Sequence, residues 1–483
     1  MSLKIFNTLS GKKEKFVPIN PDYTGFYVCG PTVYDYFHIG NARPFIIFDV
    51  IRRFLISRGY NVRYVMNLTD IDDKIINRAK DEGVTSKEIA DRYINAFFED
   101  IQKLGVRPAD VYPRATDHIE EIIGIISSLV EKGAAYPTAG DVFYDVSQFE
   151  EYGRLSKKKV EDLQAGKRVA VDELKKNPAD FVLWKKAKQG EPSWPSPWGN
   201  GRPGWHIECS AMSMKFLGQS FDFHGGGQDL IFPHHENEIA QSCASTGCDV
   251  FAKYWLHNGF LDMKGEKMSK SLGNFITARE LMELYPTAAI RLFFLQKHYR
   301  GPIDFSEEGL NAARTTAERL SLTYKKLMDL IPENREEFNA ENIKNSKRLE
   351  EFYERIESLD GELIASMEDD FNTPAVIGKL FDMVREVNKY IDDGVADGPE
   401  KDILSWVQMK FDGYDRFLGI IDKTRDGIDF ERMDNVMQTV IKLRHSLRKE
   451  KNWVLADQLR DDLTEAGILL EDSASGTTWR WRK

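Results

Sequence analysis

The sequence has few cysteines, and this scarcity limits what its thiols can do. Only four of the 483 residues are cysteine, namely Cys29, Cys209, Cys243 and Cys248. So few thiols in a large acidic chain argue against a disulfide framework and predict a reducing cytoplasm, where thiols are kept for metal binding or chemistry. Cys243 and Cys248 lie close in sequence, but we do not expect a redox role for this pair.

The sequence also lacks a long apolar run and an excess of positive charge. No apolar stretch is long enough to span a membrane, so we expect no membrane partner, and we expect no signal peptide. The formal net charge of −11 argues against a polybasic nucleic-acid surface, so any RNA contact must be local. A chain of 483 residues is too long for one hydrophobic core, and several domains are therefore expected.

The stretch Gly25–Asn41 organises the first part of the chain. A short apolar strand at 26–28 breaks at 29–31, and the apolar pattern predicts a buried helix from about 43 to 58. Alternation predicts a further strand at 62–68. Strand, helix and strand in this order form half of a doubly wound nucleotide-binding fold. Its ligand lies at the strand ends, beside the helix N-terminus.

Two short motifs carry candidate phosphate ligands. His38-Ile39-Gly40-Asn41 stands where the predicted helix begins, although such a motif alone is more often a turn with a surface histidine. The second motif, Lys267-Met268-Ser269-Lys270-Ser271, sets two lysines around a serine on a glycine-bounded loop. Lysines are mobile point charges suited to a triphosphate, whereas one such loop alone is usually a solvated turn.

Together the two motifs resemble the paired signatures of class I aminoacyl-tRNA synthetases. The resemblance narrows to the cysteinyl-tRNA synthetase family and covers nearly the whole chain. It is carried by YVCGPTVYD, NLTDIDDKI, RPGWHIECSAM, FHGGGQDLIFPHHENEIAQS and ADQLRDDLTEAGILLED. It implies an α/β fold: a Rossmann-like doubly wound catalytic domain with an inserted connective domain, then an α-helical bundle and a small C-terminal anticodon-binding domain.

Pattern and resemblance together divide the chain into six expected segments. They are the first half of the Rossmann catalytic domain at 1–117, the connective peptide insertion at 118–203, the second catalytic half at 204–265, the KMSKS loop and stem-contact region at 266–306, the tRNA-binding helical bundle at 307–397 and the C-terminal anticodon-binding domain at 398–483. Lysines of the insertion, such as Lys157 and Lys158, form either a solvated face or a contact for the acceptor end of an RNA. Trp479 and Trp481, interleaved with arginine, either stack on bases or tuck into their own domain.

Side chains suited to a metal are spread over three parts of the chain. His234 and Glu238 are four residues apart after Pro233, a favourable first-turn residue, and this spacing puts both on one helix face. His235 is expected to point elsewhere. Cys29 at a strand end and Cys209 near a helix start would complete a set typical of zinc. No compact CxxC pattern is present, so spacing alone also allows two buried thiols and a surface His–Glu pair.

The resemblance implies one Zn²⁺ on Cys29, Cys209, His234 and Glu238. Cysteine and serine differ by one atom, and an apolar pocket separates such near-isosteres by only about 10–200-fold. Zinc bonds sulfur and stabilises it as thiolate, so no separate editing domain is expected. Catalytic zinc usually has three protein ligands and an open position. The site therefore either expands or releases a weak ligand such as Glu238 when the substrate arrives.

The resemblance also implies the substrate-binding residues. The amino-acid pocket is expected to be lined by Gly30, Thr69, Trp205 and His224, with Trp205 over the small side chain and Thr69 near the amino group. The expected ATP-binding residues are His38, Gly40, Asn41, Gly226, Gly227, Asp229, Lys267, Ser269 and Lys270. Asn41 replaces the histidine that is commonest at its position, so this site can donate a hydrogen bond but cannot become cationic.

The expected partners are therefore ATP with Mg²⁺, L-cysteine and tRNA(Cys), in an enzyme expected to be a cytoplasmic monomer. His38 and Asn41 would hold phosphate, and Lys267 and Lys270 would neutralise the departing pyrophosphate. Two alternatives remain open. A ligase that makes a small thiol from the same adenylate would lack residues from about 400 onward, and a non-catalytic zinc-dependent RNA-binding protein would not need the lysine motif.

Overall fold

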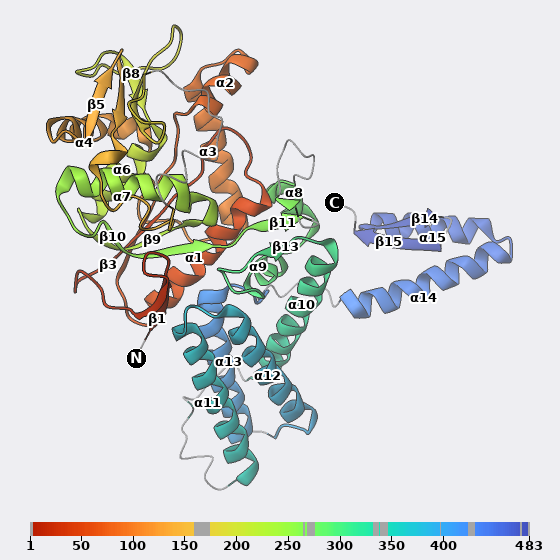
Figure 1. Ribbon diagram of the computed structural model, residues 1–483. Coiled ribbons are helices and arrows are strands. Elements are labelled where there is room, and N and C mark those ends of the chain that lie inside the picture. Colours follow the sequence, from red (N-terminus) through yellow and green to blue (C-terminus); the bar gives the residue numbers. More distant parts are fainter. Residues whose placement is uncertain are drawn as a thin grey trace. The chain divides into compact units, whose positions relative to one another are not determined.

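A four-stranded parallel sheet forms the centre of the expected catalytic domain (Figure 1). Its strands are β3 (Thr24–Val28), β4 (Val62–Met66), β9 (Phe221–Gly227) and β10 (Ala252–Asn258), in the spatial order β10-β9-β3-β4. All neighbouring pairs are parallel. β3 is buried along its whole length, as expected for a parallel strand covered on both faces. The predicted α/β class is confirmed.

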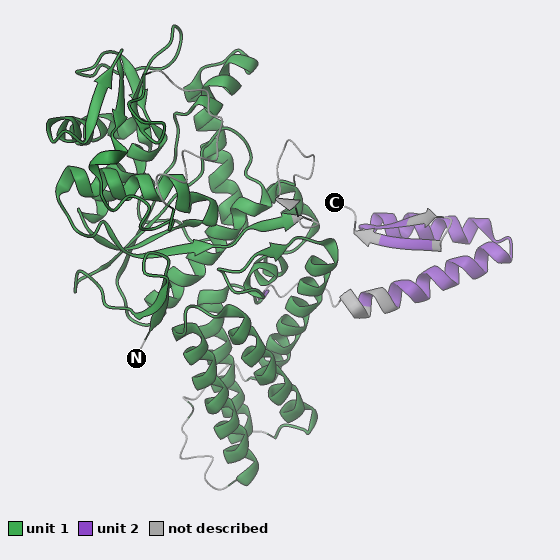
Figure 2. Ribbon diagram, viewed as in Figure 1, with its two compact units in different colours: residues 1–421 green, residues 422–483 purple. Residues whose placement is uncertain are grey.

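The computed structural model describes residues 3–158, 174–263, 266–267, 276–331, 338, 346–396, 398–423, 430–473 and 476–481. The chain divides into two compact units, Met1–Ile421 and Asp422–Lys483 (Figure 2). Among the described helices, none combines the length and apolar character needed to cross a membrane.

Helix α1 (Ile39–Ser57) connects β3 to β4 and is buried over most of its circumference. Phe45, Ile46 and Phe48 are each at most 3% exposed, in agreement with the predicted buried helix. His38 is the N-cap residue, as expected from its place in the motif. The chain leaves the helix through Gly59, whose φ of 87° is the left-handed conformation that glycine adopts readily.

The strand order reverses direction at β3. The chain adds β4 on one side of β3 and later adds β9 on the other, through α6 (Trp205–Leu217). Helix α7 (Glu236–Thr246) then leads to β10. In open parallel sheets, ligands bind outside the carboxyl ends of the strands at such a reversal. Cys29, which follows β3, and Gly227, which ends β9, lie at this point.

A second sheet, formed by the expected insertion, lies between β4 and β9 in sequence and shares a buried cluster with α6 and α7. This antiparallel sheet has the order β5-β6-β7-β8 and is accompanied by α4 (Ile119–Glu131). The strands are β5 (Ala135–Thr138), β6 (Asp141–Tyr144), β7 (Phe181–Lys186) and β8 (Gly201–Pro203). Ile122, Tyr144 and Trp184 belong to a buried cluster of this region. Of its expected lysine-rich stretch, residues 159–173 lie outside the described residues.

The remaining elements of the catalytic half frame this sheet. They are β1 (Lys4–Asn7), β2 (Lys12–Lys15), α2 (Asp73–Glu82), α3 (Ser86–Lys103), β11 (Leu261–Met263), β12 (Glu266–Lys267), α8 (Ala278–Leu284), α9 (Thr287–Leu295) and β13 (Ile303–Asp304). Short helical turns lie at η1 (Ala115–His118), η2 (Val146–Gln148), η3 (Gln228–Leu230) and η4 (Ile231–His235). β1 and β2 form an antiparallel N-terminal hairpin.

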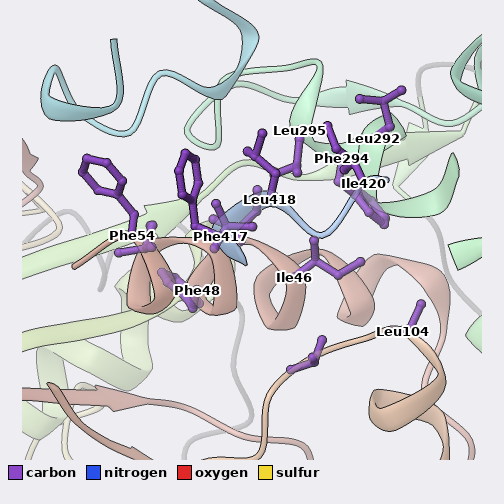
Figure 3. Close-up of a cluster of buried hydrophobic side chains, with 14 of the residues drawn as sticks. Ile46, Phe48, Phe54, Leu104, Leu292, Phe294, Leu295, Phe417, Leu418 and Ile420 are labelled. Atoms are coloured by element: carbon purple, nitrogen blue, oxygen red, sulfur yellow. The ribbon is translucent and has the colours of Figure 1, made fainter. Parts of the chain in front are cut away.

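A helical bundle completes the first unit (Figure 1). It contains α10 (Glu307–Leu330), α11 (Lys347–Glu368), α12 (Thr373–Asp392) and α13 (Pro399–Leu418). Helix α13 belongs to the first compact unit, whereas the last domain is predicted to begin at residue 398. The reason is packing: the rings of Phe417 and Phe54 lie 5.5 Å apart, and Figure 3 shows Phe417 and Leu418 against α1.

The second unit is a helical hairpin followed by a β-hairpin. It contains α14 (Phe430–Lys449), α15 (Trp453–Glu465), β14 (Ile468–Ser473) and β15 (Gly476–Trp481). Met437, Ile468 and Leu470 form a small buried cluster, and the partly buried Trp479 packs against it. For Trp479 the structure therefore favours the alternative in which the tail tucks into its own domain.

Candidate active site and metal centre

Cys29 is held at the end of β3 by backbone bonds. Its N–H donates to the carbonyl of Gly225 on β9 at 3.2 Å. The next N–H, of Gly30, donates to Oδ1 of Asn67 at 2.9 Å. A Cβ on residue 30 would lie 1.7 Å from the backbone oxygen of Asn67, so only glycine fits this approach. The thiol of Cys29 is thereby fixed at the reversal point of the sheet.

The other three predicted metal ligands converge beside this thiol. Sγ of Cys29 lies 3.9 Å from Sγ of Cys209 and 3.8 Å from Oε1 of Glu238. Nε2 of His234 lies 3.1 Å from the same Glu238 oxygen. One ligand atom from each of the four residues lies within 4.8 Å of all the others. The thiols come from the residue after β3 and from α6, and the imidazole and carboxylate come from η4 and α7.

The spacing of these donor atoms suits a tetrahedral metal ion. Bonds of about 2.0–2.3 Å to nitrogen, oxygen and sulfur place tetrahedral ligand atoms about 3.3–3.8 Å apart. The separations of 3.9, 3.8 and 3.1 Å are close to this range. Cys209, His234 and Glu238 are each at most 1% exposed, so polar groups that would be costly to bury alone are gathered in one place.

His235 does not point away from the centre, contrary to the expectation from helical spacing. Its Nε2 lies 3.4 Å from Sγ of Cys29. The regular helix α7 begins only at Glu236, and residues 231–235 form a π turn with a non-helical Phe232 (φ −141°, ψ 131°). His235 also stands three residues before Glu238, and residues three apart are neighbours on a helix, so both histidines reach the centre. A second candidate donor set results, with Cys29, His224, His235 and Glu238.

Outer contacts orient the two histidines of η4. Nδ1 of His234 lies 2.8 Å from Nδ1 of His206, and Nδ1 of His235 lies 2.8 Å from Nε2 of His257. His257 continues to Oγ1 of Thr8 at 2.8 Å. Such contacts fix the ring orientation of metal-binding histidines. The first donor set contains two thiols and the second contains one, so the first is the better match to zinc.

The charges at the centre are strongly coupled. A hydrogen bond from Cys29 lowers the pKa of the Cys209 thiol to about 6, against the effect of burial. Burial raises the pKa of Cys29 well above its usual range. Burial opposes a charge on His234, but Cys209 and Glu238 together raise its pKa to about 10. Burial likewise opposes ionisation of Glu238, but His224 and His234 lower its pKa to about 2. The site therefore favours a thiolate and a carboxylate, both anionic metal ligands.

Trp205 and His224, two of the predicted pocket residues, touch this centre directly. The Trp205 ring lies 4.2 Å from the His234 ring, and Trp205 remains 41% exposed, so it forms a wall open to solvent. Nε2 of His224 lies 2.8 Å from Oε2 of Glu238, and its ring stacks on Trp255 at 4.5 Å. Nδ1 of His224 is buried and has no hydrogen-bond partner within the described part of the chain.

Thr69 and Gly30 are joined through Asn67. Nδ2 of Asn67 donates to Oγ1 of Thr69 at 3.2 Å, while its Oδ1 accepts from Gly30. The Thr69 hydroxyl donates to Glu208 at 3.2 Å. Burial raises the pKa of Glu208 well above its usual range. Asn67 and Glu208 were not predicted, although both lie in the recognised stretches NLTDIDDKI and RPGWHIECSAM.

The first nucleotide motif caps α1. Nδ1 of His38 accepts a hydrogen bond from the N–H of Asn41 at 3.2 Å, and Gly40 lies between them in the first turn. The N–H of Ile39 donates to Ile276 at 3.1 Å, and the N–H of Ala278 donates to Phe37 at 3.1 Å. The segment that follows the lysine motif is thus hydrogen-bonded to the segment that contains His38.

The lysine motif itself is only partly described. The backbone of Lys267 belongs to β12, which pairs with β11. Ser269 and Lys270 lie outside the described residues. Gly227 ends β9 and Asp229 lies in η3, directly before η4. A Cβ on Gly226 would lie 2.7 Å from the ring of His235, so this glycine, predicted for a close approach to ATP, also makes room for His235.

Comparisons with solved structures define the fold. The chain aligns with Mycobacterium tuberculosis methionyl-tRNA synthetase in complex with methionyl-adenylate (TM-score 0.58, 16% identity, 82% of this chain and 90% of that one). It also aligns with an Agrobacterium radiobacter LeuRS in a ternary complex (TM-score 0.62, 12% identity, 84% and 85%). A family profile described as the tRNA synthetases class I (C) catalytic domain matches residues 15–315. Fold and site are those of a class I tRNA synthetase.

Sequence comparisons narrow this class to one family. A protein named cysteine–tRNA ligase from Heliobacterium modesticaldum is 48% identical over 482 residues, which cover 99% of this chain and 100% of that protein. One of the same name from Geobacter sp. strain M21 is 49% identical over 490 residues, with the same coverage. Profiles for the DALR domain and the cysteinyl-tRNA ligase anticodon binding domain match residues 362–421 and 433–480. The chain belongs to the cysteine–tRNA ligase family.

Proposed function

We propose that this protein attaches L-cysteine to tRNA(Cys) in two steps. The cysteine carboxylate attacks the α-phosphate of ATP and releases pyrophosphate, which gives cysteinyl-adenylate. The 2′-hydroxyl of the terminal tRNA ribose then takes the cysteinyl group and releases AMP. The observation that carries this proposal is the thiol-rich donor set of Cys29, Cys209, His234 and Glu238 at the reversal point of a class I synthetase sheet.

The donor set would hold Zn²⁺ and select the substrate side chain. Zinc, when bound, would supply a Lewis acid that bonds sulfur far better than a hydroxyl. Glu238 is the ligand best suited to give way to the substrate, because His224 already engages its second oxygen at 2.8 Å. The solvent-exposed side of the centre at Trp205 gives a small substrate side chain access to the donor atoms. The indole would then exclude water above that side chain.

The chain's own groups would position the two reacting substrates. The Thr69 hydroxyl accepts a hydrogen bond from Asn67 and donates one to Glu208, so it is oriented to meet the amino group of the substrate cysteine. His38 and Asn41 at the N-terminus of α1 would hold phosphate. Lys267 and Lys270 would neutralise the leaving pyrophosphate, and Mg²⁺ would accompany ATP. These groups accelerate the reaction by placement and by stabilising charge.

The tRNA would contact the helical bundle and the C-terminal unit. The match of residues 433–480 to an anticodon-binding domain supports this role and disfavours a ligase that makes only a small thiol. A cytoplasmic location and a monomeric state remain predictions from the sequence.

The test is aminoacylation of tRNA(Cys) with each of the standard amino acids, together with amino-acid-dependent ATP–pyrophosphate exchange. We expect both activities with cysteine alone. Exchange with cysteine but no charging of tRNA would support the small-thiol ligase instead. Binding of tRNA without exchange by any amino acid would support the non-catalytic RNA-binding protein.

A further inference from the structure

Arg43 is a fully buried cation that binds only backbone carbonyls among its described contacts. It lies on α1, two residues after Asn41, and is 0% exposed. Its Nη1 donates to the carbonyls of Gly259 at 2.5 Å and Phe260 at 2.8 Å. Burial lowers its pKa to about 10, which leaves the guanidinium charged at neutral pH. The Asp262 carboxylate partly offsets this effect, but no direct ion pair to Arg43 is seen within the described part of the chain. Burying such a charge is costly, so this arrangement calls for a reason.

The other acceptors of Arg43 belong to the turn between α9 and β13. Its Nη2 donates to Gly301 at 2.6 Å, Tyr299 at 3.1 Å and His298 at 3.4 Å. The turn is also joined directly to the end of β10, because the N–H of Gly259 donates to the carbonyl of Tyr299 at 2.8 Å. Arg43 therefore joins three segments: the first turns of α1, the start of β11 and the turn 298–301.

Two of these segments adjoin the predicted phosphate-binding motifs. Helix α1 begins with His38–Asn41, and β11 pairs with β12, which contains the backbone of Lys267. β13 pairs with β11 on its other side, in parallel. A displacement of the turn 298–301 would therefore shift β11 relative to α1, and with it one motif relative to the other.

The opposite side of the same turn is bound by Asp370 of the helical bundle. This carboxylate is 0% exposed. Its Oδ1 accepts from the hydroxyl of Tyr299 at 2.9 Å and from the N–H of Phe6 at 2.8 Å. Its Oδ2 accepts from Nε and Nη2 of Arg300 at 2.9 and 2.8 Å. Nε2 of His298 also lies 3.5 Å from Oδ2. The carboxylate thus engages three consecutive side chains of the turn whose carbonyls bind Arg43.

The backbone around Asp370 is strained in a way that fits a positioning role. Asp370 and Phe371 have φ values of 63° and 52°, a conformation that residues other than glycine rarely adopt. The N–H of Asp370 is bound to the carbonyl of Lys4 at 2.8 Å. Strain of this kind persists only where the surroundings fix it, and here the turn between α11 and α12 is fixed against the catalytic domain.

We propose that Asp370, the turn 298–301 and Arg43 form a positioning relay by which the helical bundle sets the relative placement of the two phosphate-binding motifs. The inference rests on the proposed function, because it assigns the relay to ATP handling in that reaction. Asp370 and Arg43 are positioning residues and contact no substrate. Movement of α11 and α12 would alter ATP activation without touching the cysteine site.

The chain provides a closely matched pair of variants. Asp370→Asn replaces one acceptor oxygen by an amide that cannot accept from Arg300, and it removes the charge. Asp369→Asn makes the same chemical change at the next residue, whose half-exposed carboxylate pairs only with Lys13 at 2.7 Å among the described residues. Tyr299→Phe is a milder variant, because it removes one hydroxyl and leaves the ring in place.

The experiment is steady-state ATP–pyrophosphate exchange with ATP and cysteine varied separately, on protein quantified by active-site titration. For Asp370→Asn we expect kcat/KM for ATP to fall about 10–100-fold, because small misplacements of reacting groups have effects of this size. KM for cysteine and zinc content should stay within about twofold, since neither depends on the relay. Asp369→Asn should match the unaltered protein. For Tyr299→Phe we expect kcat/KM for ATP to fall about 2–10-fold. If Asp370→Asn does not fold, Tyr299→Phe still tests the proposal.

If folded Asp370→Asn or Tyr299→Phe keeps an unchanged kcat/KM for ATP, the relay is refuted, even if the Tm is lowered. The contacts of Asp370 with the turn 298–301 would then serve stability alone. An equal loss for ATP and cysteine would overturn the relay as well, because it would show general damage to the site. Absence of cysteine-dependent exchange in the unaltered protein would instead refute the proposed function, so the two failures are distinguishable.

Discussion

Nε of Arg291 donates a hydrogen bond to the backbone carbonyl of Leu418 at 2.9 Å, across 127 residues of sequence. Arg291 lies on α9, and its Nη2 pairs with Asp49 of α1 at 3.0 Å; both side chains are at most 2% exposed. Leu418 is the last residue of α13. The end of the bundle is therefore bound to the helix that carries the first nucleotide motif, as Figure 3 shows for the surrounding apolar side chains.

The hydrogen bond between Arg291 and Leu418 ties α13 to the first unit, so it limits which C-terminal truncations can leave that unit folded. We expect a truncation after Ile421 to keep cysteine activation nearly intact while tRNA charging collapses, because the first compact unit ends there. A truncation after residue 397 would remove α13 and expose the surface that it covers. Loss of Phe417 and Leu418 alone would cost about 3–6 kcal/mol of burial, a large part of a typical free energy of unfolding of about 5–15 kcal/mol.

Both truncations can be measured by pyrophosphate exchange, tRNA charging and thermal unfolding. The shorter protein should unfold at a lower temperature or fail to fold, and the longer one should unfold like the first unit of the full chain. If the protein cut after 421 is folded but loses activation in parallel with charging, the division of labour between the two units is wrong.

Lys270→Ala should impair adenylate formation far more than cysteine binding. The lysine is expected to meet negative charge that develops on the leaving pyrophosphate, so its contribution belongs to the transition state. Loss of one such contact should lower the rate about 10²–10³-fold. Lys12→Ala, in the exposed strand β2, is the matched control and should change nothing. A pyrophosphate-exchange rate within a few-fold of the unaltered protein would remove Lys270 from this role.

Much of the fold follows from local patterns. The alternation and the apolar run around Gly25–Asn41 predict β3, α1 and β4 because each element buries a face of its own period. The position of α13 cannot be predicted from local patterns. Its amphipathic pattern shows that the helix has an apolar face but not which partner covers that face. Phe417 packs on Phe54, which is 363 residues away in sequence, and no local pattern encodes that choice.

Local sequence patterns also predict only part of the metal site. The four-residue spacing of His234 and Glu238 correctly places both on one face, since their side chains meet at 3.1 Å. The expectation that His235 points elsewhere is wrong, because His235 stands three residues before Glu238 and residues three apart also share a helix face. Cys29 and Cys209 meet only through the packing of β3 and α6, so the resemblance, and not the spacing, brought them into the set.

The two donor sets make different predictions for the histidines. If Cys29, Cys209, His234 and Glu238 bind zinc, His234→Ala removes a ligand and should weaken zinc binding by well over 100-fold, more than the loss of a supporting contact does. His235→Ala removes a group outside the set and should cost about 10–100-fold. Zinc affinity measured by competition with a chromophoric chelator distinguishes the two. The reverse order of effects would assign the metal to the second set, which contains His224 and His235.

The last prediction is that the metal selects the amino acid as well as shaping the pocket. Removal of the metal should weaken cysteine binding far more than ATP binding, and the already weak binding of serine should change little. If the substrate binds as thiolate, cysteine uptake should release a proton. Its affinity should then fall as the pH drops, because protons compete with the metal for sulfur.

Calorimetric titration of metal-replete and demetallated protein with cysteine and with ATP, in buffers of different ionisation enthalpy, measures both the affinities and the proton release. Cys209→Ser should reproduce the effect of metal removal, because it replaces a thiolate ligand that lies 3.9 Å from Cys29. Cys248→Ser is the matched control, since its thiol contacts Cys243 and Gln219 rather than the centre. Cobalt-substituted protein should gain thiolate charge-transfer absorption when cysteine is added. Unchanged cysteine affinity in folded metal-free protein, without that absorption, would leave the metal a structural role only.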